Sequence, residues 1–159
     1  MVITNKTIFL EYRHYLYILE ECIKWAPKET GGIIMGYNKT DQYWVTDIIG
    51  PGSKARHELY TFNPDNEFHE KEMARVYNDS GRIHTYLGDW HTHPNNKSYL
   101  SELDKKTLRN ISSNPECQLP EPLMFILGTA PLELKAWIYQ PRNLFAYKHP
   151  IIKLVKSCM

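Results

Sequence analysis

The chain has 159 residues, of which 42% are hydrophobic and 13% aromatic, a composition typical of a globular domain and not of a disordered segment. Lys and Arg total 19 against 18 acidic residues. The resulting net charge of +1 excludes electrostatic attraction as the basis for binding nucleic acid or an anionic membrane. Cys22, Cys117 and Cys158 show neither metal-ligand nor redox spacing, and residues 1–6 lack the apolar run of a signal peptide. These features predict a cytoplasmic protein without a disulfide framework.

The first third of the chain predicts one helix followed by a hairpin. Apolar residues at helical spacing over residues 12–25 predict the helix, and Pro27 ends it. After Gly31-Gly32, the apolar run 33–37 predicts a buried strand, and residues 43–49 predict its hairpin partner.

Further helices and strands are predicted in the rest of the chain. They are a strand at 59–62, a helix after 63–65, a strand at 86–93, a helix at 101–111, and strands at 123–127 and 134–139. In the helix at 101–111, Leu103, Leu108 and Ile111 are expected to face inward. Residues 151–159 alternate apolar and basic residues, so strand and tail both remain open. We therefore predict a single mixed α/β domain over residues 1–159.

A possible metal site stands at the end of the predicted strand 86–93. His91 and His93 are two positions apart, so in an extended strand both side chains project from the same face. Pro94 favours an extended conformation for His93 and so places both histidines at the strand end. Asp104 falls in the first turn of the next predicted helix, and the loop 95–100 allows its carboxylate to fold back toward them.

Two imidazoles and one carboxylate are typical of a catalytic zinc ion, which takes three protein ligands and leaves one coordination position open. The sequence offers no obvious fourth ligand nearby. A metal-activated water also needs a base, and Glu29, directly before Thr30-Gly31-Gly32, is the candidate.

Each of these residues also has a simpler explanation. Short His-x-His motifs arise by chance, and Ser101 with Asp104 could be a helix capping box that competes for the Asp104 carboxylate. Without its context, a glutamate such as Glu29 is usually a charged surface residue, and a tryptophan such as Trp90 usually packs in the core. The other histidines are expected to be ordinary packed or solvated side chains: His14, His57, His69, His84 and His149.

Taken together, these residues resemble the signature of the JAB1/MPN (JAMM) metalloproteases. That signature combines a distant glutamate with a His-x-His-Pro string, a serine, and an aspartate three positions later. Here Glu29 precedes His91-Thr92-His93-Pro94, which runs through residues 95–100 to Ser101 and Asp104. Gly50-Pro51-Gly52 further resembles the bacterial branch of the family. The resemblance covers roughly residues 11–139 and fills every position of the signature.

The resemblance implies a cytidine-deaminase-like fold, a curved mixed sheet flanked by helices. It implies one Zn²⁺ per chain on His91, His93 and Asp104, Glu29 as general acid/base, and Ser101 as a hydrogen-bond donor to the oxyanion. The implied substrate is a protein conjugated through the C-terminal tail of ubiquitin or a ubiquitin-like protein. Similar small bacterial proteins accompany activating (E1-like) and conjugating (E2-like) enzymes in anti-phage operons, so these enzymes are expected partners, whereas nucleic acid and membrane are not.

Three alternatives remain open at this point. A scaffold of the same fold that has lost catalysis usually lacks a metal ligand, and this chain lacks none. An iron(II) oxygenase also uses two histidines and a carboxylate, but in a different order and spacing. A hydrolase of small-molecule amides with the same fold would share the whole signature, so the sequence does not distinguish it from a peptidase.

Overall fold

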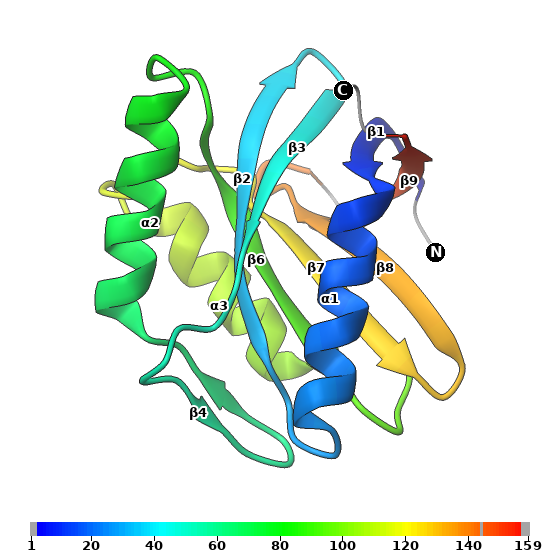
Figure 1. Ribbon diagram of the computed structural model, residues 1–159. Helices are drawn as coiled ribbons and strands as arrows, with labels where there is room; N and C mark the ends of the chain where they lie inside the picture. Colours follow the sequence, from blue (N-terminus) through cyan, green and yellow to red (C-terminus); the bar gives the residue numbers. More distant parts are fainter. Residues whose placement is uncertain (1–2, 144, 157–159) are drawn as a thin grey trace.

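The computed structural model describes residues 3–143 and 145–156, which form nine strands and three helices (Figure 1). In chain order these are β1 (Ile3–Glu11), α1 (Tyr12–Trp25), β2 (Gly31–Lys39), β3 (Gln42–Ile49), β4 (Arg56–His57), β5 (Phe62–Asn63), α2 (Asn66–Asp79), β6 (Thr85–His93), α3 (Glu102–Ser113), β7 (Leu123–Thr129), β8 (Leu132–Tyr139) and β9 (Tyr147–Val155). The prediction of a mixed α/β fold is confirmed.

The main sheet is curved so strongly that it closes. Its strands follow the order β1-β3-β2-β6-β7-β8-β9, and β9 pairs in parallel with β1 to complete the barrel. Parallel and antiparallel pairs are mixed, because β6 runs antiparallel to β2 and parallel to β7. The strands β4 and β5 form a separate two-stranded hairpin, which we call the β4–β5 hairpin.

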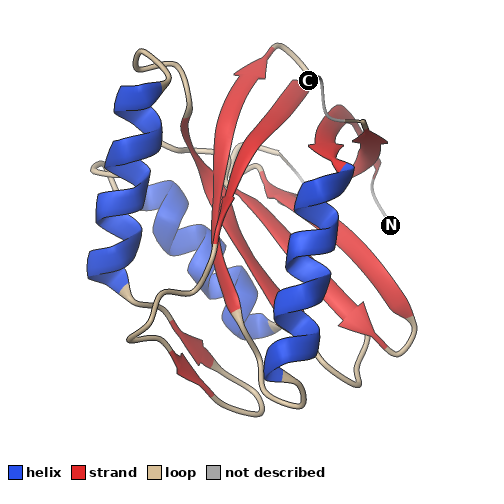
Figure 2. Ribbon diagram, in the orientation of Figure 1, coloured by secondary structure: helices blue, strands red, loops and turns tan. Residues whose placement is uncertain are grey.

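The three helices cover the two faces of this sheet (Figure 2). On one face, Ile18 and Cys22 of α1 pack into the largest hydrophobic cluster, to which Trp90 contributes. On the other face, α2 and α3 each cover a smaller cluster, around Val76 and Leu108 respectively. Trp90 is 1% exposed, so its predicted role in core packing is confirmed. Among the described residues, no helix combines the length and the apolar character needed to cross a bilayer.

Two predicted details of the sequence analysis are wrong. Residues 59–62 do not form a strand of their own, because only Phe62 belongs to one, and residues 58–61 connect the two short strands of the β4–β5 hairpin. Leu103 does not face inward: it is 58% exposed, since it lies in the first turn of α3, whereas Leu108 is fully buried and Ile111 half-buried.

The open question about the C-terminal segment has an answer as far as Val155. Residues 151–155 belong to β9, which pairs with β1 and β8, so this part of the segment is a strand and not a tail. Residues 157–159, including Cys158, lie outside the described residues.

Candidate metal centre and active site

The two histidines of the signature lie at the C-terminal end of β6. In the sheet, His91 pairs with Gly31 of β2 on one side and with Ile126 of β7 on the other. The residue between the histidines, Thr92, is fully buried on the opposite face, and its backbone N–H donates to the carbonyl of Thr30. The strand is therefore held from both sides, and its alternation turns both imidazoles toward a common cavity.

A capping box at the start of α3 brings Asp104 to the histidines. Ser101 Oγ accepts a hydrogen bond from the Asp104 N–H at 3.1 Å, and Asp104 Oδ2 accepts one from the Ser101 N–H at 2.9 Å. The second carboxylate oxygen, Oδ1, lies 3.2 Å from His91 Nε2. The capping role and the ligand role were expected to compete for this carboxylate. The capping hydrogen bond uses Oδ2 and leaves Oδ1 facing His91, so the cap does not occupy the whole carboxylate.

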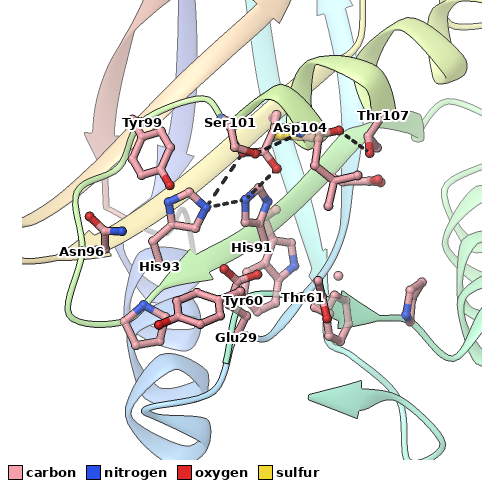
Figure 3. A pocket seen from close by; sticks show the side chains of 18 of the residues that line it. Glu29, Tyr60, Thr61, His91, His93, Asn96, Tyr99, Ser101, Asp104 and Thr107 are labelled. Carbon is pink, nitrogen blue, oxygen red and sulfur yellow. Dashed lines mark hydrogen bonds and ion pairs between the residues drawn. The ribbon is translucent and has the colours of Figure 1, made fainter. Parts of the chain in front are cut away.

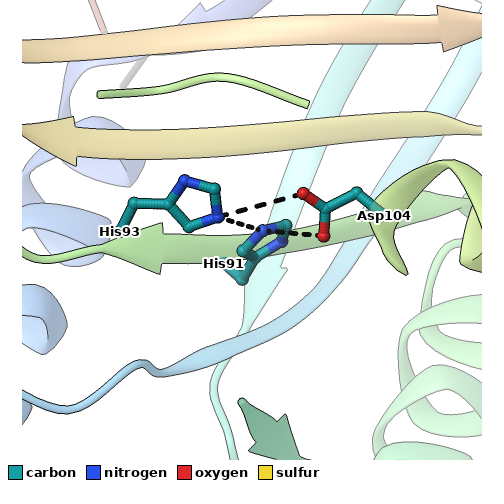
Figure 4. Close-up of side chains that lie close together, drawn as sticks. All are labelled: His91, His93 and Asp104. Carbon is teal, nitrogen blue, oxygen red and sulfur yellow. Dashed lines mark hydrogen bonds and ion pairs between the residues drawn. The ribbon is translucent and has the colours of Figure 1, made fainter. Parts of the chain in front are cut away.

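Three potential ligand atoms converge here, from His91, His93 and Asp104 (Figure 4). The two Nε2 atoms are 3.1 Å apart, and Asp104 Oδ2 lies 3.9 Å from His93 Nε2. Ligands at zinc–nitrogen and zinc–oxygen distances of about 2.0–2.1 Å are about 3.3 Å apart in a tetrahedron. The spacing and the donor types therefore fit a zinc ion with three protein ligands.

The ring orientation and the protonation of His93 favour the same use. His93 Nδ1 donates to the carbonyl of Lys97 at 3.0 Å, which leaves the Nε2 lone pair of the neutral ring directed at the cavity. Burial, together with the neighbouring His91, lowers the pKa of His93 and keeps this ring neutral.

The Asp104 carboxyl is held in its ionised form. Burial alone would raise the pKa of Asp104, but its hydrogen bond and charge interaction with His91, together with hydrogen bonds from Ser101, outweigh burial and lower this pKa to about 2. An ionised carboxylate is the form that a metal ion requires.

Glu29 reaches the same cavity from the segment between α1 and β2. Figure 3 shows its carboxylate beside Tyr60, on the side of the imidazoles away from Ser101 and Asp104. Burial raises the pKa of the Glu29 carboxyl to about 7; nearby His91 opposes this shift and Asp104 adds to it. Glu29 is half-buried, so it is not the freely solvated surface charge that the residue type alone suggests.

Gly31 allows the Glu29 segment to lie this close to β6. A Cβ at Gly31 would stand 2.4 Å from the backbone oxygen of Trp90 and 3.1 Å from the Cβ of His91. Contacts that close to backbone are not tolerated, so any larger residue would push the segment away from the histidines. The absence of a side chain at Gly31, two residues after Glu29, is therefore a steric requirement of this close approach.

All five signature side chains line one cavity of about 340 Å³. Ser101 Oγ accepts a hydrogen bond from the Asp104 N–H, and the Ser101 hydroxyl lies at the wall of the cavity beside the Asp104 carboxylate. Further walls of the cavity are apolar or aromatic and come from the β4–β5 hairpin, the loop before α3, α3 and β7: Leu59, Tyr60, Phe62, Tyr99, Leu103 and Met124.

The sequence analysis missed this apolar part of the cavity. The signal that could have revealed it is the pair Leu59-Tyr60, which is 53% and 82% exposed in a segment without alternating polarity. Large apolar residues at an exposed turn are typical of a binding surface. Without the hairpin geometry, however, nothing in the sequence connects residues 58–62 to residues 91–104.

The chain is similar to known proteins over most of its length. Residues 12–139 match the family described as prokaryotic homologs of the JAB domain. A probable metalloprotease of Sinorhizobium fredii is 40% identical over 127 residues, which cover 77% of each chain. A CD-NTase/cGAS isopeptidase of Vibrio cholerae is 30% identical over 87 residues, 54% of this chain and 56% of that protein.

A solved structure supports the same fold. A protein from Desulfitobacterium hafniense, determined in solution, superposes with a TM-score of 0.72 over 94% of both chains. Its sequence is 18% identical to this one, so the likeness concerns the fold.

Proposed function

The chain belongs to the prokaryotic JAB branch of the JAMM metalloproteases, and from this premise we propose that it is a zinc-dependent isopeptidase. The proposed bond is the one after the C-terminal tail of a ubiquitin-like protein joined to a target. The observation that carries this proposal is the arrangement around a single cavity of three potential ligand side chains, the Glu29 carboxyl with its raised pKa, and the Ser101 hydroxyl.

In this proposal His91, His93 and Asp104 hold the metal ion. A zinc ion bound there supplies a Lewis acid that polarises a carbonyl and lowers the pKa of water. The sheet pairing of β6 holds His91 and His93, and the capping box of α3 holds Asp104, so the protein itself arranges the three donor side chains.

Glu29 and Ser101 carry out the proton transfer and the charge stabilisation. The ionised Glu29 carboxylate takes a proton from the attacking water, whose oxygen bonds to the carbonyl carbon. The C–N bond then breaks, and Glu29 gives the proton to the departing amine nitrogen. The products are a free amine on the target and a carboxylic acid on the tag, which keeps the water's second proton and releases it to solvent as it ionises. Ser101 Oγ donates to the carbonyl oxygen as negative charge develops on it.

The apolar lining of the cavity supports a peptide tail as substrate. The cavity lies between the β4–β5 hairpin and the loop that precedes α3, and its apolar walls stand on either side of the ligand set. A C-terminal tail lying along these walls would place one carbonyl beside Ser101 and Glu29. The name of the Vibrio cholerae relative, an isopeptidase, points to the same class of bond.

We further propose that the chain reverses a protein modification in a bacterial antiviral system, as the relatives named after CD-NTase/cGAS suggest. Its partners would then be a ubiquitin-like tag, the tagged protein, and the E1-like and E2-like enzymes that attach the tag. The thiols of Cys22 and Cys117 are free, which agrees with action in a reducing cytoplasm.

The test is cleavage of a defined conjugate by zinc-loaded protein, followed by mass spectrometry. We expect wild type to release the tag with an intact C-terminus, and Glu29→Gln to bind one zinc ion per chain but to lose turnover. Turnover by Glu29→Gln close to that of wild type would contradict the assigned base. A protein that binds zinc but cleaves only small amides, or nothing, would favour the small-molecule hydrolase or the scaffold, respectively.

A further inference from the structure

The main chain of Glu29 is anchored to the β4–β5 hairpin. The Glu29 N–H donates to the carbonyl of Glu58 at 2.8 Å, and the Glu29 carbonyl lies 3.0 Å from Nδ1 of His57. Glu29 itself belongs to neither α1 nor β2. Both of its main-chain hydrogen-bonding groups are therefore satisfied by the hairpin, which is remote in sequence but forms one wall of the cavity.

The chemistry of the two atoms fixes the direction of the second bond. A carbonyl oxygen only accepts, so His57 Nδ1 carries the hydrogen and donates it to Glu29. Burial lowers the pKa of His57, so the ring is neutral near neutral pH, with its proton on Nδ1 and a lone pair on Nε2.

Aromatic neighbours hold the His57 ring in place. Trp25 stacks on it, with ring centroids 3.4 Å apart and an interplanar angle of 12°. Phe62 of β5 lies against it with centroids 5.4 Å apart. Trp25 is in turn oriented by a hydrogen bond from its Nε1 to Glu21 at 3.2 Å. The end of α1, the hairpin and the Glu29 segment thus meet at His57.

We infer that His57 is a positioning residue for the proposed base: its Nδ1–H holds the Glu29 carbonyl and so sets where the Glu29 carboxylate stands relative to the metal ligands. The inference rests on the proposed function for its catalytic meaning. It does not make His57 a catalytic residue, because its ring is directed at main chain and not at the cavity. Losing the donor would free the Glu29 carbonyl to turn toward water, and displacing a reacting group by about 1 Å can cost up to about 10²-fold in rate.

The experiment separates the donor from the aromatic ring. His57→Phe keeps a ring between Trp25 and Phe62 but removes the donor, whereas His57→Asn removes the ring and keeps an amide N–H close to the place of Nδ1. His149→Phe is the matched control, because His149 also lies against a tryptophan, with centroids 3.4 Å apart, and its Nδ1 also faces a backbone carbonyl, at 3.3 Å. His149 lies on β9, and the control should leave kcat unchanged.

We expect His57→Phe to lower kcat about tenfold with KM within about twofold, because the base is displaced while the binding walls remain. His57→Asn should keep kcat within about threefold of wild type, and all variants should bind one zinc ion. Wild-type kcat in His57→Phe, or an equal loss in His57→Asn, would overturn the inference. If His57→Phe fails to fold, His57→Leu takes its place. Leu and Asn are nearly equal in size, so comparing these two variants again isolates the loss of the hydrogen-bond donor.

Amide hydrogen exchange of Glu29, followed by NMR, tests the inference without substrate. We expect the Glu29 N–H to exchange about tenfold faster in His57→Phe than in wild type, and at a near wild-type rate in His57→Asn. Unchanged exchange in His57→Phe would overturn the positioning role even if kcat falls. If wild type cleaves no conjugate at all, the proposed function fails, while the exchange rates still decide whether His57 holds Glu29.

Discussion

The two sides of the active site are built in different ways. The proposed metal ligands, which we call the ligand side, come from β6, which has a strand on each side, and from the first turn of a capped helix. Glu29 instead lies between elements, and its main chain is held by a hairpin whose two strands have two residues each. Buried strands open only in near-global unfolding, whereas short exposed hairpins open locally at a much lower free-energy cost.

This difference implies that metal binding and turnover can be separated by mutation. Substitutions of the proposed ligands should lower metal affinity, and the loss of activity should follow from the loss of the ion. Substitutions on the hairpin side, by which we mean Glu29 and the β4–β5 hairpin, should impair substrate binding or catalysis while the ion stays bound. The two carboxyl groups also differ in pKa: despite burial, the interactions with His91 and Ser101 lower the pKa of Asp104 to about 2, whereas burial raises the pKa of Glu29 to about 7.

The largest effect is expected at Asp104. Asp104→Asn removes the charge that faces His91 but keeps an oxygen that can accept the Ser101 N–H, so the helix cap survives. Zinc affinity should fall about 10²-fold or more, since even outer-shell changes cost about 10–100-fold. Competition with a chromophoric chelator measures this zinc affinity. Asp104→Ala should lose the same affinity and, in the metal-free protein, a further ~1 kcal/mol of stability from the cap.

Removing the Ser101 hydroxyl comes next. Ser101→Ala should lower kcat by about 10²-fold through loss of the donor to the oxyanion, and should lower stability by about 1 kcal/mol through loss of the N-cap. Steady-state kinetics and urea unfolding measure the two effects. Asp65→Ala, which removes the N-cap of α2, is the stability control. An equal loss of kcat in that control would assign the Ser101 effect to stability.

A smaller effect is expected at the tip of the hairpin. Leu59→Ala should raise KM about fivefold, the equivalent of about 1 kcal/mol of apolar contact, without changing zinc content. Leu132→Ala is a matched control, because Leu132 is 54% exposed against 53% for Leu59 and lies at the start of β8, outside the cavity lining. Zinc loss in Leu59→Ala would contradict the separation of the two sides.

The smallest effect concerns stability against pH in the metal-free protein. The folded-state pKa of Glu29 is raised from 4.5 to about 7, so between these values the native state binds more protons at this site than the unfolded state. Stability from Glu29 is therefore fully present below pH 4.5 and is lost as the pH rises through 7. The difference in unfolding free energy between wild type and Glu29→Gln, measured in chelator at pH 5 and pH 8, should change in that direction. A constant difference would mean that Glu29 is solvated.

Much of the ligand side could be predicted from the sequence, because it depends on local geometry. Strand alternation places His91 and His93 on one face, and the three-residue spacing of Ser101 and Asp104 is the spacing of a capping box. What spacing could not reveal is that one oxygen of the Asp104 carboxylate accepts the capping hydrogen bond while the other faces His91.

The hairpin side could not be predicted, because its contacts connect distant segments. His57 reads in the sequence as an ordinary histidine, and only the fold brings it to the Glu29 carbonyl, 28 positions away in the chain. The strand predicted at residues 59–62 was wrong for the same reason: exposed apolar residues there face a cavity and not a sheet neighbour. Periodicity predicts burial, but it does not distinguish a core from a binding wall.

The closure of the barrel has a consequence for aggregation. The strands that complete it, β1 and β9, lie wholly outside the matched residues 12–139, so within the match β3 and β8 would each have an unpaired edge. Pairing of β1 with β3 and of β9 with β8 covers both edges. Exposed strand edges recruit other chains into intermolecular sheets. Trimming this protein to its matched segment would therefore be expected to promote self-association through the two uncovered edges.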